Sequence, residues 1–167
     1  LGRVEVEANT PLLEKNIKDK IVMITGAGGS IGSEISRQVA SIGASKIILL
    51  DSNEYALYQI KSELEGNNIA GKLVSVIANV THSKRIRDVC MALKVDTIFH
   101  AAAYKHVPLV EENPFEGFYN NVIGTKTCLE AAIACDVKTF VLISTDKAVR
   151  PTNIMGATKR FAEMILQ

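Results

Sequence analysis

The sequence predicts an α/β fold, a doubly wound parallel sheet with strand order 3-2-1-4-5. Short apolar runs alternate with helical segments along most of the chain, which is typical of parallel strands joined by right-handed helical crossovers. Each apolar run is nearly continuous, as expected for strands that are buried on both faces. A glycine-rich loop, residues 26–32, separates the first apolar run from the first helical segment, where such folds bind phosphates.

Five strands and five main helices are predicted after an N-terminal arm. Residues 1–19 are polar and charged, and we read them as the arm, with a short helix near Leu12–Ile17. The strands are predicted at Lys20–Thr25, Lys46–Leu50, Lys72–Ala78, Thr97–His100 and Thr139–Ile143. The helices are predicted at Ser30–Ile42, Asn53–Leu64, Ser83–Leu93, Phe115–Ala134 and Asn153–Gln167.

Several helix boundaries carry their own signals. Gly43 is expected to end the first helix, Asn53 to cap the second and Gly66 to stop it. Pro114 precedes the long helix, as prolines often do. The charged segment 105–112 is read as a loop.

Composition limits the classes of function. The chain has 167 residues, of which 47% are apolar, with a mean hydropathy of +0.16, so one globular domain is expected. The net charge of +1 argues against bulk electrostatic binding to nucleic acid or to a membrane surface. No apolar run reaches the length of a membrane span. The three cysteines show no metal-binding spacing, so we expect buried thiols in a reducing compartment and no metal site.

The glycine-rich loop has the spacing G-x-x-G-x-x-G. Residues 25–32 read Thr-Gly-Ala-Gly-Gly-Ser-Ile-Gly. Gly26 permits the tight turn out of the strand, Gly29 lets backbone amides approach a pyrophosphate, and Gly32 lets the helix pack closely. The free N–H groups and the positive dipole end of the helix then face the phosphates. This context predicts a dinucleotide-binding Rossmann fold, and an incidental glycine-rich turn is the alternative.

Three further strand ends fit a dinucleotide. Asp51 ends the second strand, where a carboxylate accepts hydrogen bonds from the adenosine ribose and repels a 2′-phosphate, so NAD is favoured over NADP. Asn79 ends the third strand and is read as an adenine contact, or alternatively as a cap. Three alanines after His100 permit close approach of a cofactor, or alternatively tight packing of a helix on a strand.

These positions and their neighbours make up the predicted cofactor site. Lys105 is read as part of a loop that faces cofactor or substrate, with a solvated charged turn as the alternative. Asn121, a polar residue on the long helix, needs partners if it is buried and suits a bridging role. The predicted cofactor contacts are Gly26, Gly28, Gly29, Ser30, Ile31, Gly32, Asp51, Asn53, Asn79, Val80, Ala101, Ala102, Ala103, Lys105, Asn121 and Lys159.

A hydroxyl, a carboxylate and an ammonium group stand side by side where the fifth strand should end. These are Thr145, Asp146 and Lys147. Beside an oxidised nicotinamide, an alcohol is oxidised to a ketone, and a lysine of lowered pKa removes the neighbouring acidic proton. The aspartic acid then protonates a leaving hydroxyl. The residues therefore suit a cycle of oxidation, elimination and reduction, and a solvated loop ion pair is the alternative.

Lys159 and Met155 are the other candidate catalytic positions. They are four residues apart and so share one face of the predicted last helix. A lysine at this place orients a ribose and lowers the pKa of a neighbouring hydroxyl. Met155 cannot transfer a proton.

Four motifs together resemble one enzyme family. They read Thr-Gly-Ala-Gly-Gly-Ser-Ile-Gly-Ser-Glu, His-Ala-Ala-Ala-Tyr-Lys-His-Val-Pro-Leu-Val-Glu, Asn-Asn-Val-Ile-Gly-Thr and Ser-Thr-Asp-Lys-Ala-Val-Arg-Pro-Thr-Asn-Ile-Met-Gly-Ala-Thr-Lys-Arg. Across essentially the whole chain the sequence resembles the nucleotide-sugar 4,6-dehydratases of bacterial polysaccharide biosynthesis. These are extended short-chain dehydrogenase/reductase proteins that act on UDP-N-acetylglucosamine.

The resemblance implies a tightly held NAD(P) that is recycled. Hydride leaves sugar C4, water is lost across C5 and C6, and hydride returns to C6. The product is a precursor for lipopolysaccharide O-antigen, capsule or protein glycans. By position, Asp146 matches the acid for the departing hydroxyl, Lys147 the base at C5, and Thr145 and Lys159 the groups around the C4 hydroxyl.

The sequence departs from the family pattern at two positions. Met155 stands where the wider superfamily has the tyrosine of Tyr-x-x-x-Lys, which matches the large, membrane-anchored branch of these dehydratases. It leaves Thr145 or Asp146 as candidates for the base at the C4 hydroxyl. Asn79 stands where relatives often carry aspartate.

The resemblance also implies that this chain is a fragment, because family members continue well past the helix that carries Lys159. We expect residues 1–19 to be the arm and residues 20–167 a cofactor domain cut off after that helix. The domain that holds the UDP-sugar is then missing, and the fragment alone is expected to be inactive. We further expect a cytoplasmic homo-oligomer, with any inner-membrane anchor outside this chain and with no nucleic-acid partner.

Two other functions remain open at this stage. A nucleotide-sugar 4-epimerase or reductase of the same superfamily needs no elimination, so Asp146 and Lys147 would be idle in it. A non-catalytic NAD-binding module is the second alternative, and Met155 favours it.

Overall fold

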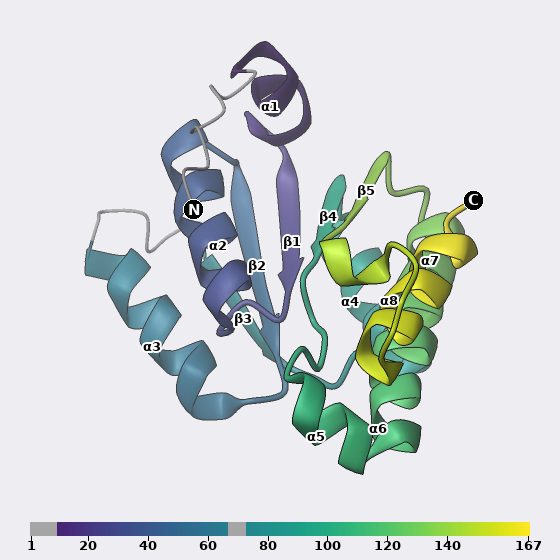
Figure 1. Ribbon diagram of the computed structural model, residues 1–167. Coiled ribbons are helices and arrows are strands. Elements are labelled where there is room, and N and C mark those ends of the chain that lie inside the picture. The colour runs from purple at the N-terminus through teal and green to yellow at the C-terminus, as the bar shows by residue number, and fades with distance from the viewer. Residues whose placement is uncertain (1–9, 67–72) are drawn as a thin grey trace.

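The computed structural model describes residues 10–66 and 73–167, and the described residues form one five-stranded parallel sheet (Figure 1). The strands are β1 (Ile21–Thr25), β2 (Lys46–Asp51), β3 (Leu73–Ile77), β4 (Thr97–His100) and β5 (Thr139–Leu142). Their spatial order is β3-β2-β1-β4-β5, with every neighbouring pair parallel. The predicted fold class and strand order are therefore confirmed.

Helices follow the strands as the alternating pattern predicts. They are α1 (Thr10–Ile17), α2 (Ser30–Ile42), α3 (Glu54–Leu64), α4 (Ser83–Leu93), α5 (Val107–Glu112), α6 (Pro114–Phe118), α7 (Gly124–Ala134) and α8 (Ile154–Ile165). The described elements also include the π-helical turn η3 (Tyr119–Ile123) and the 3₁₀-helical turn η4 (Asp146–Ala148). The predicted bounds of α2 and α4 agree with the structure at both ends.

The central strands β1 and β2 are buried on both faces because each carries apolar side chains on both. In β1, Val22 and Ile24 pack with α1, α2 and α3, whereas Met23 packs with α4 and α7 on the other face. In β2, Ile47 and Leu49 share the first face, and Ile48 and Leu50 the second. This explains why β1 and β2 are continuous apolar runs that do not alternate apolar with polar residues. The edge strand β3 differs, because Ser75 and Ile77 are exposed on either side of buried Val76.

Local signals set several boundaries as expected. Gly43 ends α2 in the left-handed conformation, with φ of 96°. The side-chain oxygen of Asn53 accepts the backbone N–H of Ala56 and so caps α3. Asn153 caps α8 in the same way, by accepting from Gly156. The predicted start of the third strand at Lys72 lies outside the described residues.

In the segment from residue 105 to 134, the expectation of a loop is wrong, whereas the expected long helix is present with one irregular turn. The stretch read as a charged loop contains α5, which begins after His106 and has Pro108 in its first turn. The long helix starts at Pro114, and the π-helical turn η3 interrupts it. A π turn inserts one extra residue into the helical ladder, and residue spacing alone gives no sign of it.

The predicted arm is tied to the sheet where the structure describes it. The side chain of Ile17 at the end of α1 is buried against the α2 and α3 face. The Asn16 side chain accepts from Thr139, and its carbonyl accepts from Thr97, so α1 joins the amino ends of β4 and β5. Figure 1 shows α1 at this end of the sheet, opposite α5.

The buried cysteine side chains were predicted correctly for two of three positions. Cys90 and Cys128 are buried free thiols, and Cys135 is partly exposed. Burial raises the pKa of Cys90 to about 12 and also raises that of Cys128, so both stay protonated. Within residues 10–66 and 73–167, none of the helices has the length and apolarity needed to cross a membrane.

Replacing Gly32 by alanine should destabilise the fold. A Cβ atom there would lie 1.9 Å from the carbonyl oxygen of Gly26, so α2 must shift or the turn must distort. We expect the free energy of unfolding to fall by about 1–3 kcal/mol in guanidinium denaturation, as for other overpacked sites. Gly66→Ala is the matched control, because its Cβ would meet nothing within 4 Å. Equal stability of the two variants would show that the close approach is not required.

Candidate functional site

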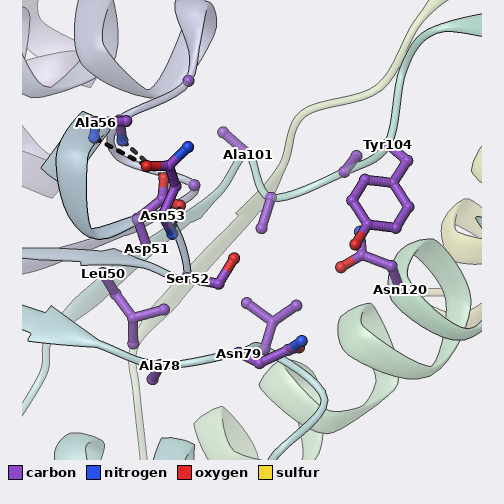
Figure 2. Close-up of a pocket in the computed structure, with 16 residues that line it drawn as sticks. Leu50, Asp51, Ser52, Asn53, Ala56, Ala78, Asn79, Ala101, Tyr104 and Asn120 are labelled. Carbon is purple, nitrogen blue, oxygen red and sulfur yellow. Dashed lines mark hydrogen bonds between the residues drawn. The ribbon is translucent and has the colours of Figure 1, made fainter.

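A cavity of about 240 Å³ opens at the carboxyl end of the sheet, above the glycine-rich loop (Figure 2). It is lined by the end of β2, by the loops that follow β1, β2, β3 and β4, by Ala56 of α3 and by Asn120 of η3. Figure 2 shows Asp51 and Asn53 on one side of it and Tyr104 and Asn120 on the other. The lining residues are Gly26, Gly28, Gly29, Leu50, Asp51, Ser52, Asn53, Ala56, Ala78, Asn79, Val80, Ala101, Ala102, Ala103, Tyr104 and Asn120.

The floor of the cavity is the glycine turn, which only glycine allows. Gly26 has φ of 66°, and a Cβ there would lie 2.7 Å from the backbone of Ala102. The turn therefore brings the end of β1 against the loop after β4. Helix α2 then begins at the edge of the cavity without a side-chain cap on Gly29, so its first backbone N–H groups suit an anion.

Asp51 is oriented by two backbone N–H groups. Gly28 donates to Oδ2 and Asn53 to Oδ1, both at 2.9 Å. A carboxylate offers about four acceptor positions, so each oxygen retains a lone pair for a further donor. Asp51 thus joins the glycine turn to the start of α3 and presents an oriented acceptor to the cavity.

The wall opposite Asp51 consists of residues 101–104, and Asn121 holds its far end. The Asn121 side-chain oxygen accepts from Tyr104 N at 2.7 Å, and its nitrogen donates to Tyr104 O at 2.9 Å. The same nitrogen donates to Thr158 Oγ1 at 3.0 Å, which ties the wall to α8. Asn121 is buried and does not line the cavity, so it supports the wall from behind.

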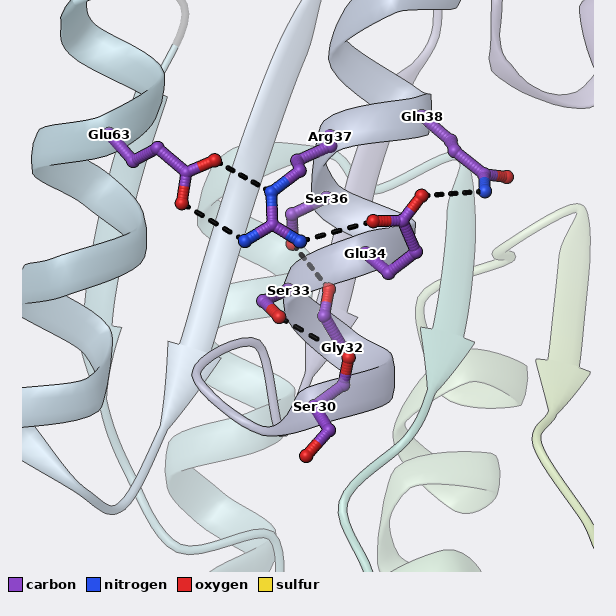
Figure 3. Close-up of polar contacts among 8 residues, drawn as sticks. All are labelled: Ser30, Gly32, Ser33, Glu34, Ser36, Arg37, Gln38 and Glu63. Atoms are coloured by element: carbon purple, nitrogen blue, oxygen red, sulfur yellow. Dashed lines mark hydrogen bonds and ion pairs between the residues drawn. The ribbon is translucent and has the colours of Figure 1, made fainter.

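A salt-bridge network joins α2 and α3 beside the cavity (Figure 3). Arg37 donates to Glu63 through two nitrogens, at 2.6 and 3.0 Å, and to Glu34 through the third at 3.1 Å. All three guanidinium nitrogens therefore face carboxylates. The group is solvent-exposed, so we assign it a modest role in holding the two helices together.

Several predicted cofactor residues lie beside the cavity and do not line it. Ser30 is exposed at the start of α2, where Lys105 Nζ donates to its hydroxyl at 3.3 Å. Ile31 is exposed and Gly32 is buried beneath the turn.

Asn79 lines the cavity and also caps a turn. Its side-chain oxygen accepts from Thr81 N and Oγ1, both at 2.9 Å.

The hydroxyl, carboxylate and ammonium group after β5 lie on an exposed turn. Thr145 Oγ1 donates to Asp146 Oδ1 at 2.9 Å, and Lys147 Nζ lies 3.8 Å from the same oxygen. The side chains of Asp146 and Lys147 are mostly exposed, so the local ion pair is present. None of these three residues lines the cavity.

Helix α8 packs directly against this turn. A Cβ atom on Gly156 would lie 2.2 Å from the carbonyl oxygen of Lys147, so backbone meets backbone there. Met155 is buried, and Lys159 is 7% exposed with its Nζ donating to Ile143 O at 2.6 Å. Burial lowers the pKa of Lys159, and the negative charge of Glu163 opposes this effect. The structure thus brings Thr145, Asp146, Lys147 and Lys159 onto two elements in contact.

Sequence reasoning missed six residues that line the cavity. Leu50, Ser52 and Ala78 adjoin predicted positions, so the ends of β2 and β3 already pointed to them. Ala56 is brought in by α3, whose position depends on tertiary packing. Tyr104 and Asn120 lie next to the predicted Lys105 and Asn121, and only the structure shows which neighbour faces inward. No group of three metal-ligating side chains occurs within residues 10–66 and 73–167.

The chain is similar to proteins of polysaccharide biosynthesis. It is 50% identical over its whole length to the capsular polysaccharide biosynthesis protein CapD of Staphylococcus aureus, of which it covers 28%. It is 38% identical over 88% of its length to a UDP-glucose 4-epimerase of Rickettsia canadensis and covers 42% of it. It is 33% identical over 84% of its length to the inverting UDP-N-acetylglucosamine 4,6-dehydratase of Campylobacter jejuni and covers 40% of it. The chain thus spans less than half the length of each relative.

Two solved structures share the fold and part of the sequence. Pen from Bacillus thuringiensis has a TM-score of 0.83 and 34% identity, with 90% of this chain and 46% of that one covered. DesIV, a dTDP-glucose 4,6-dehydratase from Streptomyces venezuelae solved with NAD bound, has a TM-score of 0.76 and 25% identity. The match covers 86% of this chain and 49% of DesIV.

A family described as polysaccharide biosynthesis protein matches residues 22–167. The match begins in β1 and includes the glycine turn, the wall after β4, the exposed turn after β5 and all of α8. The chain therefore belongs to this family of polysaccharide biosynthesis proteins, within the extended short-chain dehydrogenase/reductase superfamily.

Proposed function

We propose that residues 20–167 are the NAD-binding part of a UDP-N-acetylglucosamine 4,6-dehydratase that serves bacterial polysaccharide or glycan synthesis. One observation carries the proposal: a cavity built on a glycine turn and an oriented Asp51 opens at the sheet edge where β5 delivers Asp146 and Lys147. The relative from Campylobacter jejuni, named for this reaction, supports the substrate. The UDP-sugar would bind mainly through parts of the protein outside this chain.

The cavity suits a dinucleotide with an unmodified adenosine ribose. A side chain on Gly26 would clash with Ala102, and one on Gly28 would clash with Ala56. Because both positions are glycine, the floor of the cavity carries no side chain there and can accept a pyrophosphate near the start of α2. Asp51 would accept hydrogen bonds from the ribose hydroxyls and repel a 2′-phosphate. Arg37, a cation nearby, is already paired with two carboxylates, which also favours NAD over NADP. When bound, NAD supplies the removal and return of a hydride.

The exposed turn and α8 supply the proton transfers. Thr145 or Asp146 would accept the proton of the C4 hydroxyl as the alcohol becomes a ketone. Lys159 would lie beside the C4 hydroxyl during this step. Lys147, in its neutral form, would remove the proton from C5 and, once protonated, would return a proton to C5 when hydride is delivered to C6. Asp146, in its protonated form, would give a proton to the leaving C6 hydroxyl, so that water departs. Met155 is buried and takes no part in proton transfer.

A UDP-glucose 4-epimerase is the second candidate. The 38% identical relative from Rickettsia canadensis, which carries that name, favours it. An epimerase oxidises C4 and reduces it again without elimination. Asp146 and Lys147 would then have no proton to transfer at C5 or C6.

The two candidates differ in one product. Incubating the full-length protein with UDP-N-acetylglucosamine in deuterated water and recording NMR spectra should reveal a 4-keto-6-deoxy sugar with deuterium at C5. An epimerase would yield the C4 epimer with its C5 proton retained. That outcome would contradict the dehydratase proposal and leave cofactor binding intact.

Asp51→Asn should weaken NAD binding. One carboxylate oxygen is replaced by an amide donor, so an oriented acceptor for the ribose is lost. Hydrogen bonds to charged groups contribute about 1.5–3 kcal/mol, so we expect the Kd of the full-length protein for NAD to rise by about tenfold or more in calorimetric titration. Asp88→Asn, an exposed carboxylate paired with Lys84 on α4, serves as the control. An unchanged Kd in the Asp51 variant would place the ribose elsewhere.

Lys147→Met should slow dehydration strongly while NAD binding persists. Removing a general base typically costs about 10²–10⁴-fold in rate, and we expect kcat of the full-length protein to fall within that range. The measurement is the rate of 4-keto product formation. Lys138→Met provides the comparison, because Lys138 is an exposed lysine that also forms an ion pair and lies directly before β5. A Lys147 variant as active as the Lys138 variant would leave the turn without a catalytic role.

A further inference from the structure

The ring of His100 is buried between two threonine hydroxyls at the carboxyl end of β4. Its Nδ1 lies 2.7 Å from Thr25 Oγ1, and its Nε2 lies 3.1 Å from Thr125 Oγ1. The side chain is 1% exposed. The imidazole therefore joins the end of β1 to α7 through the interior, and the proton transfers proposed above do not use it.

The contacts of Thr125 decide which ring nitrogen carries the proton. Its hydroxyl donates to the carbonyl oxygen of Asn121 at 2.7 Å, and a carbonyl can only accept. Thr125 Oγ1 must then accept from His100, so Nε2 is the donor. A neutral imidazole has one N–H, so Nδ1 accepts from the hydroxyl of Thr25. The neighbours thus select a single tautomer.

The environment also keeps the ring neutral. Burial, with a smaller contribution from the positive charge of Lys159 on α8, lowers the pKa of His100 to about 3. The unfolded chain would titrate this histidine near its ordinary pKa of about 6.5. His100 therefore remains uncharged across the range in which histidines usually switch.

The loop that follows His100 is the cavity wall, residues 101–104, and it is fixed at both ends. Near its start, Ala102 N donates to Thr25 Oγ1 at 3.5 Å. At its end, the Asn121 side chain pairs with both backbone groups of Tyr104. Asn121 and Thr125 lie one turn apart in the continuous helical segment of η3 and α7. The His100–Thr125 contact therefore holds β4 to the segment that grips the far end of the wall.

We infer that His100 is a positioning residue for the cofactor, a neutral Nε2–H imidazole that fixes the cavity wall relative to β1 and α7. The inference rests on the proposed function, since it takes NAD as the occupant of the cavity. His100 does not itself line the cavity and acts through residues 101–104. Loosening the contact should let the wall move away from the cofactor and weaken binding.

Two buried threonines, one in β4 and one in α7, allow a matched test. Thr125 donates to the carbonyl of Asn121 and Thr97 to that of Asn16, each at 2.7 Å. Thr97 begins β4, at the opposite end of the sheet from the cavity. Valine at either position removes a buried hydroxyl at nearly constant shape, so both variants should lose comparable stability.

In the full-length protein, Thr125→Val should raise the Kd for NAD by about tenfold, whereas Thr97→Val should change it by less than about twofold. Thr125→Ser, which retains the hydroxyl, should restore most of the affinity. Equal NAD affinity in the two valine variants would overturn the inference. A wild-type protein that binds no NAD would instead contradict the proposed function.

Two further measurements keep the test decisive if Thr125→Val does not fold. His100→Gln keeps an N–H that can reach Thr125, and His100→Leu keeps none, so the leucine variant should bind NAD more weakly. Solid-state ¹⁵N NMR of histidine-labelled protein, with the glutamine variant for assignment, should show an Nε2–H ring unchanged between about pH 5 and 8. Equal affinities, an Nδ1–H ring or titration in that range would each refute the inference.

Discussion

The close approach of α2 to the end of β1 is the constraint on which the rest of the site depends. With no side chain at Gly32, the helix rests on the carbonyl of Gly26, and with φ of 66° at Gly26 the chain turns beneath the helix. Gly28 can then donate to Asp51, which fixes the end of β2 to the same turn. The loop after β4 lies against Gly26 from the other side. One backbone turn thus sets the positions of both sides of the cavity.

A second backbone contact fixes the turn that follows β5. Gly156 lets α8 touch the carbonyl of Lys147, so the turn that carries Asp146 is held by the helix that carries Lys159. Asn121 links this turn and helix to the cavity, because its side-chain amide hydrogen-bonds both to Tyr104 in the cavity wall and to Thr158 in α8. The cofactor wall and the helix with the buried lysine are therefore parts of one connected structure.

Much of the fold follows from the sequence because its signals are local. The β strands are continuous apolar runs, and residues such as Asn53 and Gly43 mark helix ends by their own chemistry. The sequence could not reveal α5, whose charged residues suit a turn equally well, nor the π turn at η3. The lining residues at strand ends were predictable because parallel strands finish at one edge. The bridging role of Asn121 was also predictable, but its particular partners and the role of His100 were not, because these contacts join residues 17 to 75 positions apart.

The central claim is that NAD spans the distance from Asp51 to the tip of β5, where Asp146 and Lys147 transfer protons. The most direct test is an experimental structure of the full-length protein with NAD and a UDP-sugar bound. The account predicts adenosine ribose hydroxyls within hydrogen-bonding distance of Asp51 and the nicotinamide ring beside Thr145 and Lys159. A dinucleotide bound elsewhere, or Asp146 and Lys147 directed away from the sugar, would contradict it.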